Sequence, residues 1–298
     1  MRLSIIIPAK NESVGLRALL ERTRRQCPEA ELIVVDDGSD DGTGAFARDQ
    51  GARVISHPMS LGNGAAIKSG VRAAGGDVLL FMDADGQHDP ADIPRLLARL
   101  EQGYDMVVGA RSDGSQASWG RGLANRLYNR LASYMTGHHI ADLTSGFRVA
   151  RADRFRPFLY LLPNGFSYPT TITMAFFRAG LAVAYEPIQA GRRKGKSHVR
   201  LFRDGVRFLL IIFRIGTLYS PLKLFFPVAA LHGLAGLGYY AYTFSTEHRL
   251  SLATLFLLSS AVTIFLIGLV SEQITQLMYK DSDNPAPRAK PDAERPNG

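Results

Sequence analysis

Two aspartates, Asp83 and Asp85, stand two residues apart directly after the apolar run 78–82 and directly before Gly86. Such a run is typical of a buried strand, and side chains at i and i+2 project to the same side of an extended chain. Two carboxylates at the end of a strand suit a divalent cation with oxygen ligands, Mg²⁺ or Mn²⁺. A solvated acidic turn has the same local sequence, so the rest of the chain must decide between a cation site and such a turn.

Polar groups also follow the first two apolar runs of the chain. Pro8–Glu12 comes after the run 3–7, and Asp36 and Asp37 come after the run 31–35. Carboxylates after a strand can accept hydrogen bonds from a nucleobase or a ribose, although a capped turn uses the same residue types.

Glycines mark a further point of close approach. Gly62 and Gly64 stand where the backbone must approach a ligand or another helix, and Lys68 follows them. The lysine side chain either reaches a phosphate or lies exposed on a helix.

Strands and helices alternate through the first 110 residues. We expect strands at 3–7, 31–37, 53–56, 78–82 and 106–109, with helices at 16–25, 40–51, 63–74 and 93–102. Helices at 122–136 and 171–178 and strands at 147–150 and 182–188 are expected farther on. This alternation predicts an α/β domain with a parallel sheet covered on both faces. Ligands of such sheets bind outside the carboxyl ends of the strands, where all these polar groups and Arg111 fall.

The charge distribution favours an anionic partner at a membrane. The chain has 35 Lys and Arg against 27 Asp and Glu, a formal net charge of +8. Many of the basic residues lie at 192–214, directly before a very apolar region. This placement indicates a phospholipid surface or a phosphorylated substrate, and no nucleic acid is expected as a partner. The single cysteine, Cys27, excludes an intrachain disulfide.

Two long apolar segments, 221–244 and 250–270, each exceed the roughly 20 residues that cross a bilayer. The five residues between them make the pair a hairpin. Basic residues on both flanks put the large domain and both termini in the cytoplasm by the positive-inside rule, at a cell or inner membrane. Gly233, Gly236 and Gly238 permit close helix–helix approach and a homo-oligomer, or are merely tolerated.

The chain thus divides into four predicted parts. Residues 1–198 form the α/β domain, and 199–220 form a basic amphipathic helix on the membrane surface. Residues 221–272 form two transmembrane helices, and 280–298 form a disordered tail.

Together, the segments 8–12, 34–43 and 81–90 resemble the motifs of family 2 glycosyltransferases with the GT-A fold, a Rossmann-like mixed sheet. The segments 142–148 and 192–198 resemble the branch of dolichyl-phosphate mannosyltransferases and polyprenyl-phosphate glycosyltransferases. The resemblance covers about residues 1–200 and, more loosely, the hairpin.

The resemblance implies a nucleotide-diphosphate sugar, GDP-mannose or a UDP-hexose, as donor. It implies a metal, Mg²⁺ or Mn²⁺, on Asp83, Asp85 and Gln87. The implied nucleotide-binding residues are Pro8, Ala9, Asn11, Glu12, Asp36, Asp37, Asp83 and Ala84.

The resemblance also implies residues for the sugar and the acceptor. Those on the sugar and diphosphate side are Asp142, Thr144, Ser145, Gly146, Arg192, Lys194, Lys196 and Ser197. The loop 192–198 either closes over the diphosphate or contacts lipid headgroups. Arg111 and Arg121 are expected to grip the acceptor phosphate and, with Asp85, to be catalytic, and Arg126 is the alternative to Arg121.

The predicted function is inverting, metal-dependent transfer of a hexose to a polyprenyl or dolichyl phosphate. A phosphate monoester has a second pKa near 6, so it is already a nucleophile at neutral pH and needs no base. Two alternatives stay open. One is a membrane-tethered enzyme that glycosylates a sugar hydroxyl, with Asp142 as the base, and the other is a non-catalytic nucleotide-binding scaffold.

Overall fold

The computed structural model describes the chain except for residues 112–118, 166–167, 190–212, 214–215, 218 and 280–298, and gives only the backbone of 119–125. The described residues form two compact units, one before residue 199 and one after it. The basic loop 192–198, most of the predicted amphipathic helix 199–220 and the tail 280–298 therefore lie outside the described residues.

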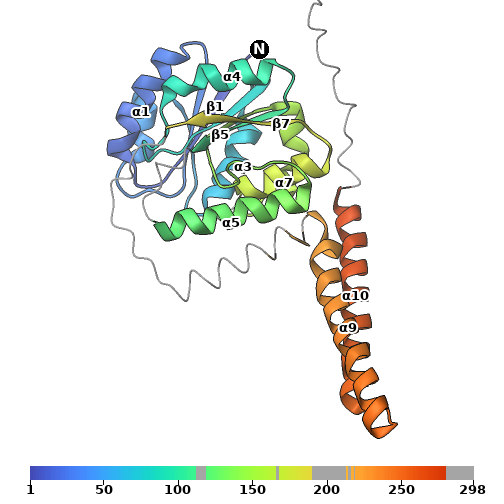
Figure 1. The fold of residues 1–298 in the computed structure, drawn as a ribbon. Helices are drawn as coiled ribbons and strands as arrows, with labels where there is room; N and C mark the ends of the chain where they lie inside the picture. The colour runs from blue at the N-terminus through green and yellow to red at the C-terminus, as the bar shows by residue number, and fades with distance from the viewer. Residues whose placement is uncertain (112–118, 166–167, 190–212, 214–215, 218, 280–298) are drawn as a thin grey trace, which may run out of the picture. The chain divides into compact units, whose positions relative to one another are not determined.

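The N-terminal unit contains a seven-stranded sheet with the order β3-β2-β1-β4-β6-β5-β7 (Figure 1). Its strands are β1 (Leu3–Ala9), β2 (Glu31–Asp36), β3 (Arg53–Ser56), β4 (Val78–Phe81), β5 (Met106–Arg111), β6 (Arg148–Arg151) and β7 (Val183–Ile188). Strand β6 runs antiparallel between β4 and β5, and the other neighbours pair in parallel. The mixed sheet of the GT-A fold is thus confirmed, whereas the all-parallel sheet predicted from the alternation is wrong at β6.

Helices connect the strands close to the predicted positions. They are α1 (Ser13–Gln26), α2 (Thr43–Asp49), α3 (Asn63–Ala73), α4 (Ile93–Glu101), α5 (Trp119–Thr136), α6 (Ala152–Phe155) and α7 (Tyr168–Arg178), with 3₁₀ turns at Pro90–Asp92 and Arg156–Leu161. Helix α1 begins three residues before the predicted start, because Ser13 and Gly15 do not continue the apolar pattern that begins at Leu16. There the Ser13 N–H donates to Asp41 Oδ2 at 3.1 Å, which satisfies a donor that the helix itself leaves free.

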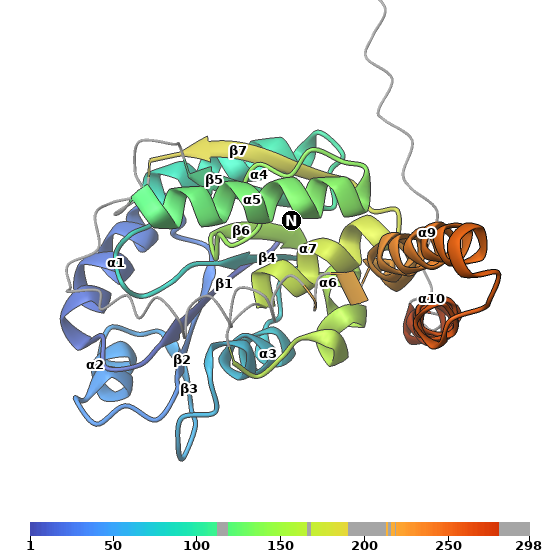
Figure 2. The same ribbon diagram turned by 60° about the horizontal axis from the view of Figure 1, so that its bottom comes forward.

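Side-chain alternation in β1 divides the core between the two faces of the sheet. Ile5 and Ile7 pack into one buried cluster with Leu16 of α1 and Leu96 of α4. Ile6 points to the opposite face, where α3 crosses β1 and β2. Figure 2 shows the helices on both sides of the sheet. The carboxyl ends of β1, β2 and β4 are thereby fixed from two sides.

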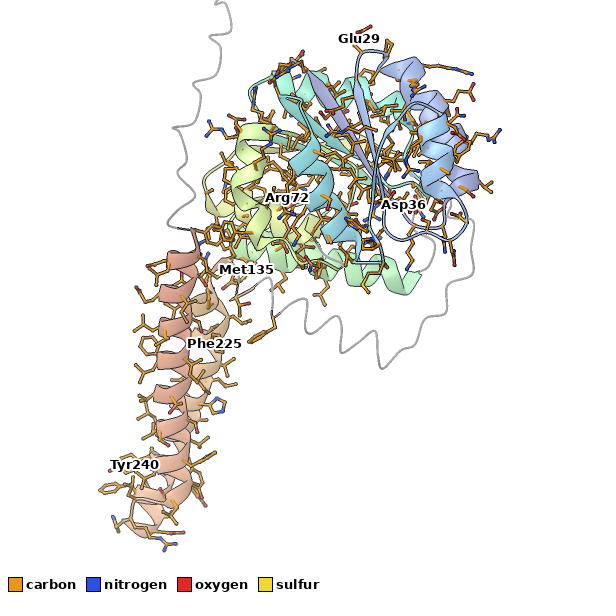
Figure 3. All side chains as sticks on the ribbon, turned by 180° about the vertical axis from the view of Figure 1, so that it is seen from behind. Glu29, Asp36, Arg72, Met135, Phe225 and Tyr240 are labelled. Atoms are coloured by element: carbon orange, nitrogen blue, oxygen red, sulfur yellow. The ribbon has the colours of Figure 1, made fainter. Side chains whose placement is uncertain are left out.

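The C-terminal unit contains two helices, α9 (Pro221–Glu247) and α10 (Leu252–Tyr279), whose most apolar 18-residue windows have mean hydropathies of 1.3 and 2.3. Both are long and apolar enough to cross a membrane, and only 11% and 17% of their most apolar windows are buried. Side chains such as Tyr240 project outward along the pair (Figure 3). This exposure fits a lipid surrounding better than the core of a water-soluble protein. Both helices are longer than the predicted segments.

Contacts within the hairpin account for part of its glycine content. A Cβ on Gly236 would lie 2.9 Å from Leu258 Cδ2, and a Cβ on Gly268 would lie 2.7 Å from Phe225 Cβ. Glu272 of α10 accepts from the Leu222 N–H at 3.2 Å and so caps the start of α9. Close helix approach at Gly236 is therefore made within one chain, and the homo-oligomer stays a prediction.

Replacing Gly70 of α3 by alanine should destabilise the N-terminal unit. The added Cβ would overlap Ile6 Cγ2 and lie 3.3 Å from Val35 Cγ2, and overpacking of this kind costs about 1–3 kcal/mol. Alanine otherwise favours a helix interior by about 1 kcal/mol, so a fall in stability reports the clash alone. Thermal unfolding of the detergent-solubilised protein measures it, and a raised midpoint would contradict the packing described.

Candidate active site

A cavity of about 540 Å³ opens at the carboxyl ends of β1, β2 and β4. Its lining consists of Pro8, Ala9, Lys10, Glu12, Asp37, Ser60, Gly62, Asn63, Ala66, Asp83, Ala84, Asp85 and Gly165. Six of the eight residues predicted to bind the nucleotide are in this set, and Asp85 joins them. Lys10, Ser60, Asn63, Ala66 and Gly165 were not predicted, and no pattern in the sequence pointed to Gly165, which belongs to a distant loop.

The other two predicted nucleotide residues, Asn11 and Asp36, hold loops together beside the cavity. The Asn11 N–H donates to Ser39 Oγ at 3.0 Å, and Asn11 Oδ1 accepts from the Asp40 N–H at 3.1 Å. Asp36, labelled in Figure 3, accepts from the Ser39 N–H at 3.0 Å. The loops that follow β1 and β2 are thus locked to each other, which fixes the cavity wall.

Asp37 lines the cavity, but its carboxylate is already fully engaged. Oδ1 contacts His57 Nδ1 at 2.7 Å and accepts from the Leu61 N–H at 2.8 Å. Oδ2 accepts from Ser60 Oγ at 2.8 Å and from the Gly62 N–H at 2.9 Å. A carboxylate has about four lone-pair positions, and all four are used. Asp37 therefore shapes the loop 57–62 and has no acceptor position left for a nucleoside in this conformation.

Asp83 and Asp85 follow β4 and both face the cavity. Burial raises the pKa of Asp83 above its usual 3.8, and the Asp85 carboxylate beside it adds to that rise. A bound cation would relieve both effects. In the described part of the chain, no three His, Cys, Asp or Glu side chains gather to hold a metal by themselves. The pair fits the usual Mg²⁺ arrangement, in which one or two carboxylates share the ion with substrate phosphates and water.

Gln87, the third predicted metal ligand, does not line the cavity. Its backbone N–H donates to Asp85 Oδ1 at 3.1 Å. His88, which the sequence left without a role, is buried and stacks on Phe147 at a ring-centroid distance of 5.1 Å. Its Nδ1 accepts from the Asp83 N–H at 3.4 Å. Backbone and imidazole together orient the two aspartates.

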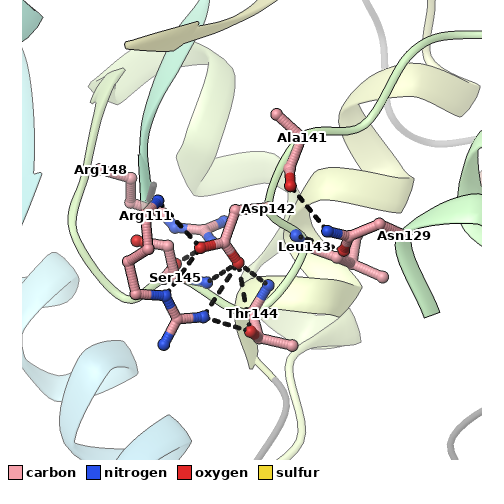
Figure 4. A network of polar contacts seen from close by, with 8 residues as sticks. All are labelled: Arg111, Asn129, Ala141, Asp142, Leu143, Thr144, Ser145 and Arg148. Atoms are coloured by element: carbon pink, nitrogen blue, oxygen red, sulfur yellow. Dashed lines mark hydrogen bonds and ion pairs between the residues drawn. The ribbon is translucent and has the colours of Figure 1, made fainter. Parts of the chain in front are cut away.

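Arg111 at the end of β5 forms a two-pronged ion pair with Asp142 (Figure 4). Nε lies 2.8 Å from Asp142 Oδ2, Nη2 lies 3.0 Å from Oδ1, and Nη2 also donates to Thr144 Oγ1 at 2.6 Å. Burial raises the pKa of Asp142, but the Arg111 guanidinium outweighs it and holds that pKa below its usual range. The arginine is thus held rigidly, with its side chain 25% exposed.

The loop after Ala141 wraps its own aspartate. Asp142 Oδ1 accepts from the backbone N–H groups of Thr144 at 3.0 Å and Ser145 at 3.1 Å. Neither these residues nor Gly146 line the cavity, and Ser145 is only 1% exposed. A Cβ on Gly146 would lie 2.6 Å from Asp83 Oδ2, so glycine is needed there for the loop to pack against the acidic pair. The predicted sugar-side loop therefore touches the predicted metal site.

Helix α5 supplies a support that the sequence did not reveal. Asn129 donates from Nδ2 to the Ala141 carbonyl at 2.6 Å, and its Oδ1 accepts from the Leu143 N–H at 3.1 Å (Figure 4). Arg121 lies on the same helix, but its side chain is outside the described residues, and Arg126 is exposed. Arg192, Lys194, Lys196 and Ser197 are also outside the described residues.

Gly62 and Gly64, at the start of α3, pack against the loop 162–165, and Gly62 also lines the cavity. The Gly64 N–H donates to the Gly165 carbonyl at 3.2 Å, and the Ala65 N–H donates to the Asn164 carbonyl at 2.9 Å. Lys68 donates to the Leu162 carbonyl at 3.2 Å and to Asn164 Oδ1. In the described residues Lys68 thus ties α3 to the loop 162–165.

The strand order with β6 inserted antiparallel, and an acidic pair at the carboxyl edge, define a GT-A domain. Comparison with family models extends this result. The model described as glycosyl transferase family 2 matches residues 4–157, and that of the GtrB C-terminal hairpin matches residues 220–277. The chain belongs to glycosyl transferase family 2.

Curated relatives show which members of the family the chain is similar to. The chain is 37% identical over 160 residues to an undecaprenyl-phosphate 4-deoxy-4-formamido-L-arabinose transferase of Proteus mirabilis, covering 50% of this chain and 49% of the relative. It is 35% identical over 205 residues to an undecaprenyl-phosphate mannosyltransferase of Micrococcus luteus, covering 63% of this chain and 83% of the relative. The match thus spans about half the length of the first relative and most of the second.

Solved structures confirm the fold. A glucosyl-3-phosphoglycerate synthase from Mycobacterium tuberculosis, crystallised with Mn²⁺ and UDP-glucose, superposes with a TM-score of 0.58 at 23% identity. The match covers 72% of this chain and 78% of that one. At this identity the likeness concerns the fold alone.

Replacing Asp37 by asparagine should lower stability at neutral pH. Burial raises the pKa of Asp37, but the hydrogen bonds from His57, Leu61, Ser60 and Gly62 outweigh it and hold the pKa at about 2, against an ordinary 3.8. A lowered folded-state pKa adds stability that is complete well above pH 4 and is lost as pH falls toward 2. The contribution at pH 7 is on the order of 2 kcal/mol.

The measurement is urea unfolding of both proteins at pH 7, 5 and 3. The difference between wild type and Asp37→Asn should shrink at pH 3. A difference that stays constant over this range would contradict the ionised, four-bonded carboxylate.

Proposed function

We propose that this protein transfers a glycosyl group from a nucleotide-diphosphate sugar to the phosphate of a membrane polyprenol. One observation carries the proposal: a single loop, Asp142–Gly146, contacts both the acidic pair and Arg111, two groups suited to binding phosphates. Asp83 and Asp85 line the cavity. Gly146 of the loop packs against Asp83, and Asp142 of the same loop forms the ion pair with Arg111. Family membership and relatives named for undecaprenyl phosphate support this reading.

The nucleotide would occupy the cavity at the ends of β1, β2 and β4. Pro8, Ala9 and Glu12 border it on one side, and the acidic pair borders it on the other. A divalent cation held by Asp83 and Asp85 would offset the charge that develops on the leaving nucleoside diphosphate. The two carboxylates would thereby place the diphosphate at the cavity mouth.

The acceptor phosphate would meet Arg111. Its Nε and Nη2 are committed to Asp142 and Thr144, and Nη1 has no partner among the described residues, so that nitrogen could bind a ligand. An acceptor phosphate oxygen attacks the anomeric carbon while the bond from that carbon to the diphosphate oxygen breaks. The nucleoside diphosphate leaves with the electron pair, and a single displacement of this kind inverts the anomeric configuration.

Asp142 is an orienting residue and not a base in this scheme. Its two oxygens already accept from Arg111, Thr144 and Ser145, and its pKa is held low. The phosphate acceptor is ionised at neutral pH and requires no base. An enzyme acting on a sugar hydroxyl would need a base, so the bonding of Asp142 favours the phosphate acceptor.

The hairpin α9–α10 would anchor the enzyme where the polyprenol lies. Lys223 stands near the start of α9, and Tyr239 and Tyr242, with ring centroids 6.4 Å apart, stand near its end. At about 1.5 Å per residue they are roughly 24–29 Å from Lys223 along the axis, close to a hydrocarbon thickness of about 30 Å. Basic and aromatic anchors at the two interfaces support a transmembrane hairpin with the catalytic domain and both termini cytoplasmic.

Loss of the second aspartate tests the metal. Asp85→Ala should lower the rate of lipid-linked sugar formation at saturating donor by about a hundredfold or more, because several kcal/mol of charge stabilisation are lost. Asp49→Ala, which removes an exposed carboxylate on α2, is the matched control and should leave the rate unchanged. The reaction is run with radiolabelled donor and undecaprenyl phosphate as acceptor, with and without EDTA, and the label in the lipid extract is measured. Full transfer by Asp85→Ala in EDTA would refute the proposed metal role.

The acceptor side has its own test. Arg111→Lys keeps the charge but cannot make the paired contact with Asp142, so the KM for prenyl phosphate should rise about ten- to a hundredfold, with the donor KM changed less than about twofold. The control, Arg99→Lys on the exposed side of α4, should change neither. Equal effects of Arg111→Lys on the donor and acceptor KM would exclude an acceptor role for Arg111.

A further inference from the structure

A buried arginine beneath the site has no place in the scheme above. Arg148 is 0% exposed and stands at the first position of β6. It pairs with Phe81 of β4, two residues before Asp83, and with Val108 of β5, three residues before Arg111. Arg148 is therefore the point of the sheet that links the strand of the acidic pair to the strand of Arg111.

The guanidinium contacts backbone and hydroxyl oxygens and no carboxylate at ion-pair distance in the described residues. Nη1 donates to the Pro169 carbonyl at 3.0 Å and to Thr173 Oγ1 at 3.1 Å, and Nη2 donates to the Ser145 carbonyl. Its Nε is buried and has no hydrogen-bond partner in the described residues. Burying an unpaired cation is costly, and a purely structural position is often filled as well by an apolar side chain.

The contact with Ser145 joins this cation to the active-site loop. The next residue, Gly146, packs against Asp83, and its carbonyl accepts from the Tyr168 hydroxyl at 3.2 Å. The Arg148 guanidinium carbon lies 5.8 Å from the centre of the Tyr168 ring. Arg148 and Tyr168 thus hold the Ser145–Gly146 segment through its two carbonyls, while Arg111 holds Asp142 at the other end of the loop.

The positive charge of Arg148 also attracts carboxylates of the active-site loop and of the acidic pair, in addition to its hydrogen bonds. Burial lowers the pKa of Arg148, and the carboxylates of Asp142 and Asp83 are among the groups that counter this effect. An arginine stays protonated in proteins, so it is a permanent cation beneath two acidic site residues. A site that must collect phosphates gains from a fixed positive charge in a medium of low dielectric constant.

We propose that Arg148 is a positioning residue for the transfer reaction. By holding the Ser145 carbonyl it sets the Asp142–Gly146 loop, and so fixes the acidic pair on the donor side relative to Arg111 on the acceptor side. This inference rests on the proposed function. It assigns the alignment of the two substrates to a residue that touches neither.

The test compares Arg148→Met, Arg148→Lys and Tyr168→Phe in the full-length protein, in detergent or in vesicles. Misalignment should lower kcat of Arg148→Met at least tenfold, with each KM and the calorimetric affinity for nucleotide sugar changed less than about threefold. Arg148→Lys should recover part of kcat, because it keeps the charge and one donor. Tyr168→Phe, which among the described residues loses the bond to the Gly146 carbonyl alone, should lower kcat in the same selective way.

The matched control is Arg154→Met. Arg154 is also buried, at 6% exposure, and lies 3.6 Å from Asp105 just before β5, at the opposite ends of the strands. The Arg154→Met substitution should lower the unfolding midpoint and leave kcat unchanged. If Arg148→Met folds and keeps wild-type kcat, the positioning role is overturned. If it does not fold, unchanged kcat in Tyr168→Phe overturns the role instead. An inactive wild type that still binds nucleotide sugar would count against the proposed function itself.

Discussion

The antiparallel insertion of β6 between β4 and β5 is the constraint on which the site depends. It leads the loop Asp142–Gly146 into the space between the end of β4 and the end of β5. One end of that loop packs on Asp83, and the other binds Arg111. Under the proposed function both substrates are anions that repel each other, so joining them would require the acidic pair and Arg111 to be fixed in one rigid frame.

Hydrogen bonding separates the carboxylates that build this frame from those that remain available. Asp37 and Asp142 use their lone pairs on protein donors, and their pKa values are held low. Asp83 and Asp85 face the cavity side by side, and burial raises the pKa of Asp83. A bound cation would therefore lower the electrostatic energy of Asp83 and Asp85. Asp37 and Asp142, in contrast, contribute to the stability of the fold.

The sequence determined most of the fold and the edge of the sheet at which the candidate site lies. Strand β3 has the predicted bounds, and the acidic pair, Arg111 and the apolar hairpin were all found from residue type and spacing. These features have local causes: apolar runs form strands, and motifs at strand ends gather at one edge of a sheet. Helix starts were less accurate, because the first turn of α1 is stabilised by Asp41 from another loop.

The tertiary structure decided what each of these residues does. Asp37 and Asn11 were expected to contact the nucleotide, and Lys68 was expected either to reach a phosphate or to lie exposed. Each instead bonds to a loop 20 or more residues away. The role of Arg148 and the antiparallel direction of β6 were not predicted either. Whether a polar side chain meets solvent, ligand or protein depends on which distant segments pack beside it. Residue type and spacing therefore determined the chemistry that this protein has available, and long-range packing determined which groups are left to perform it.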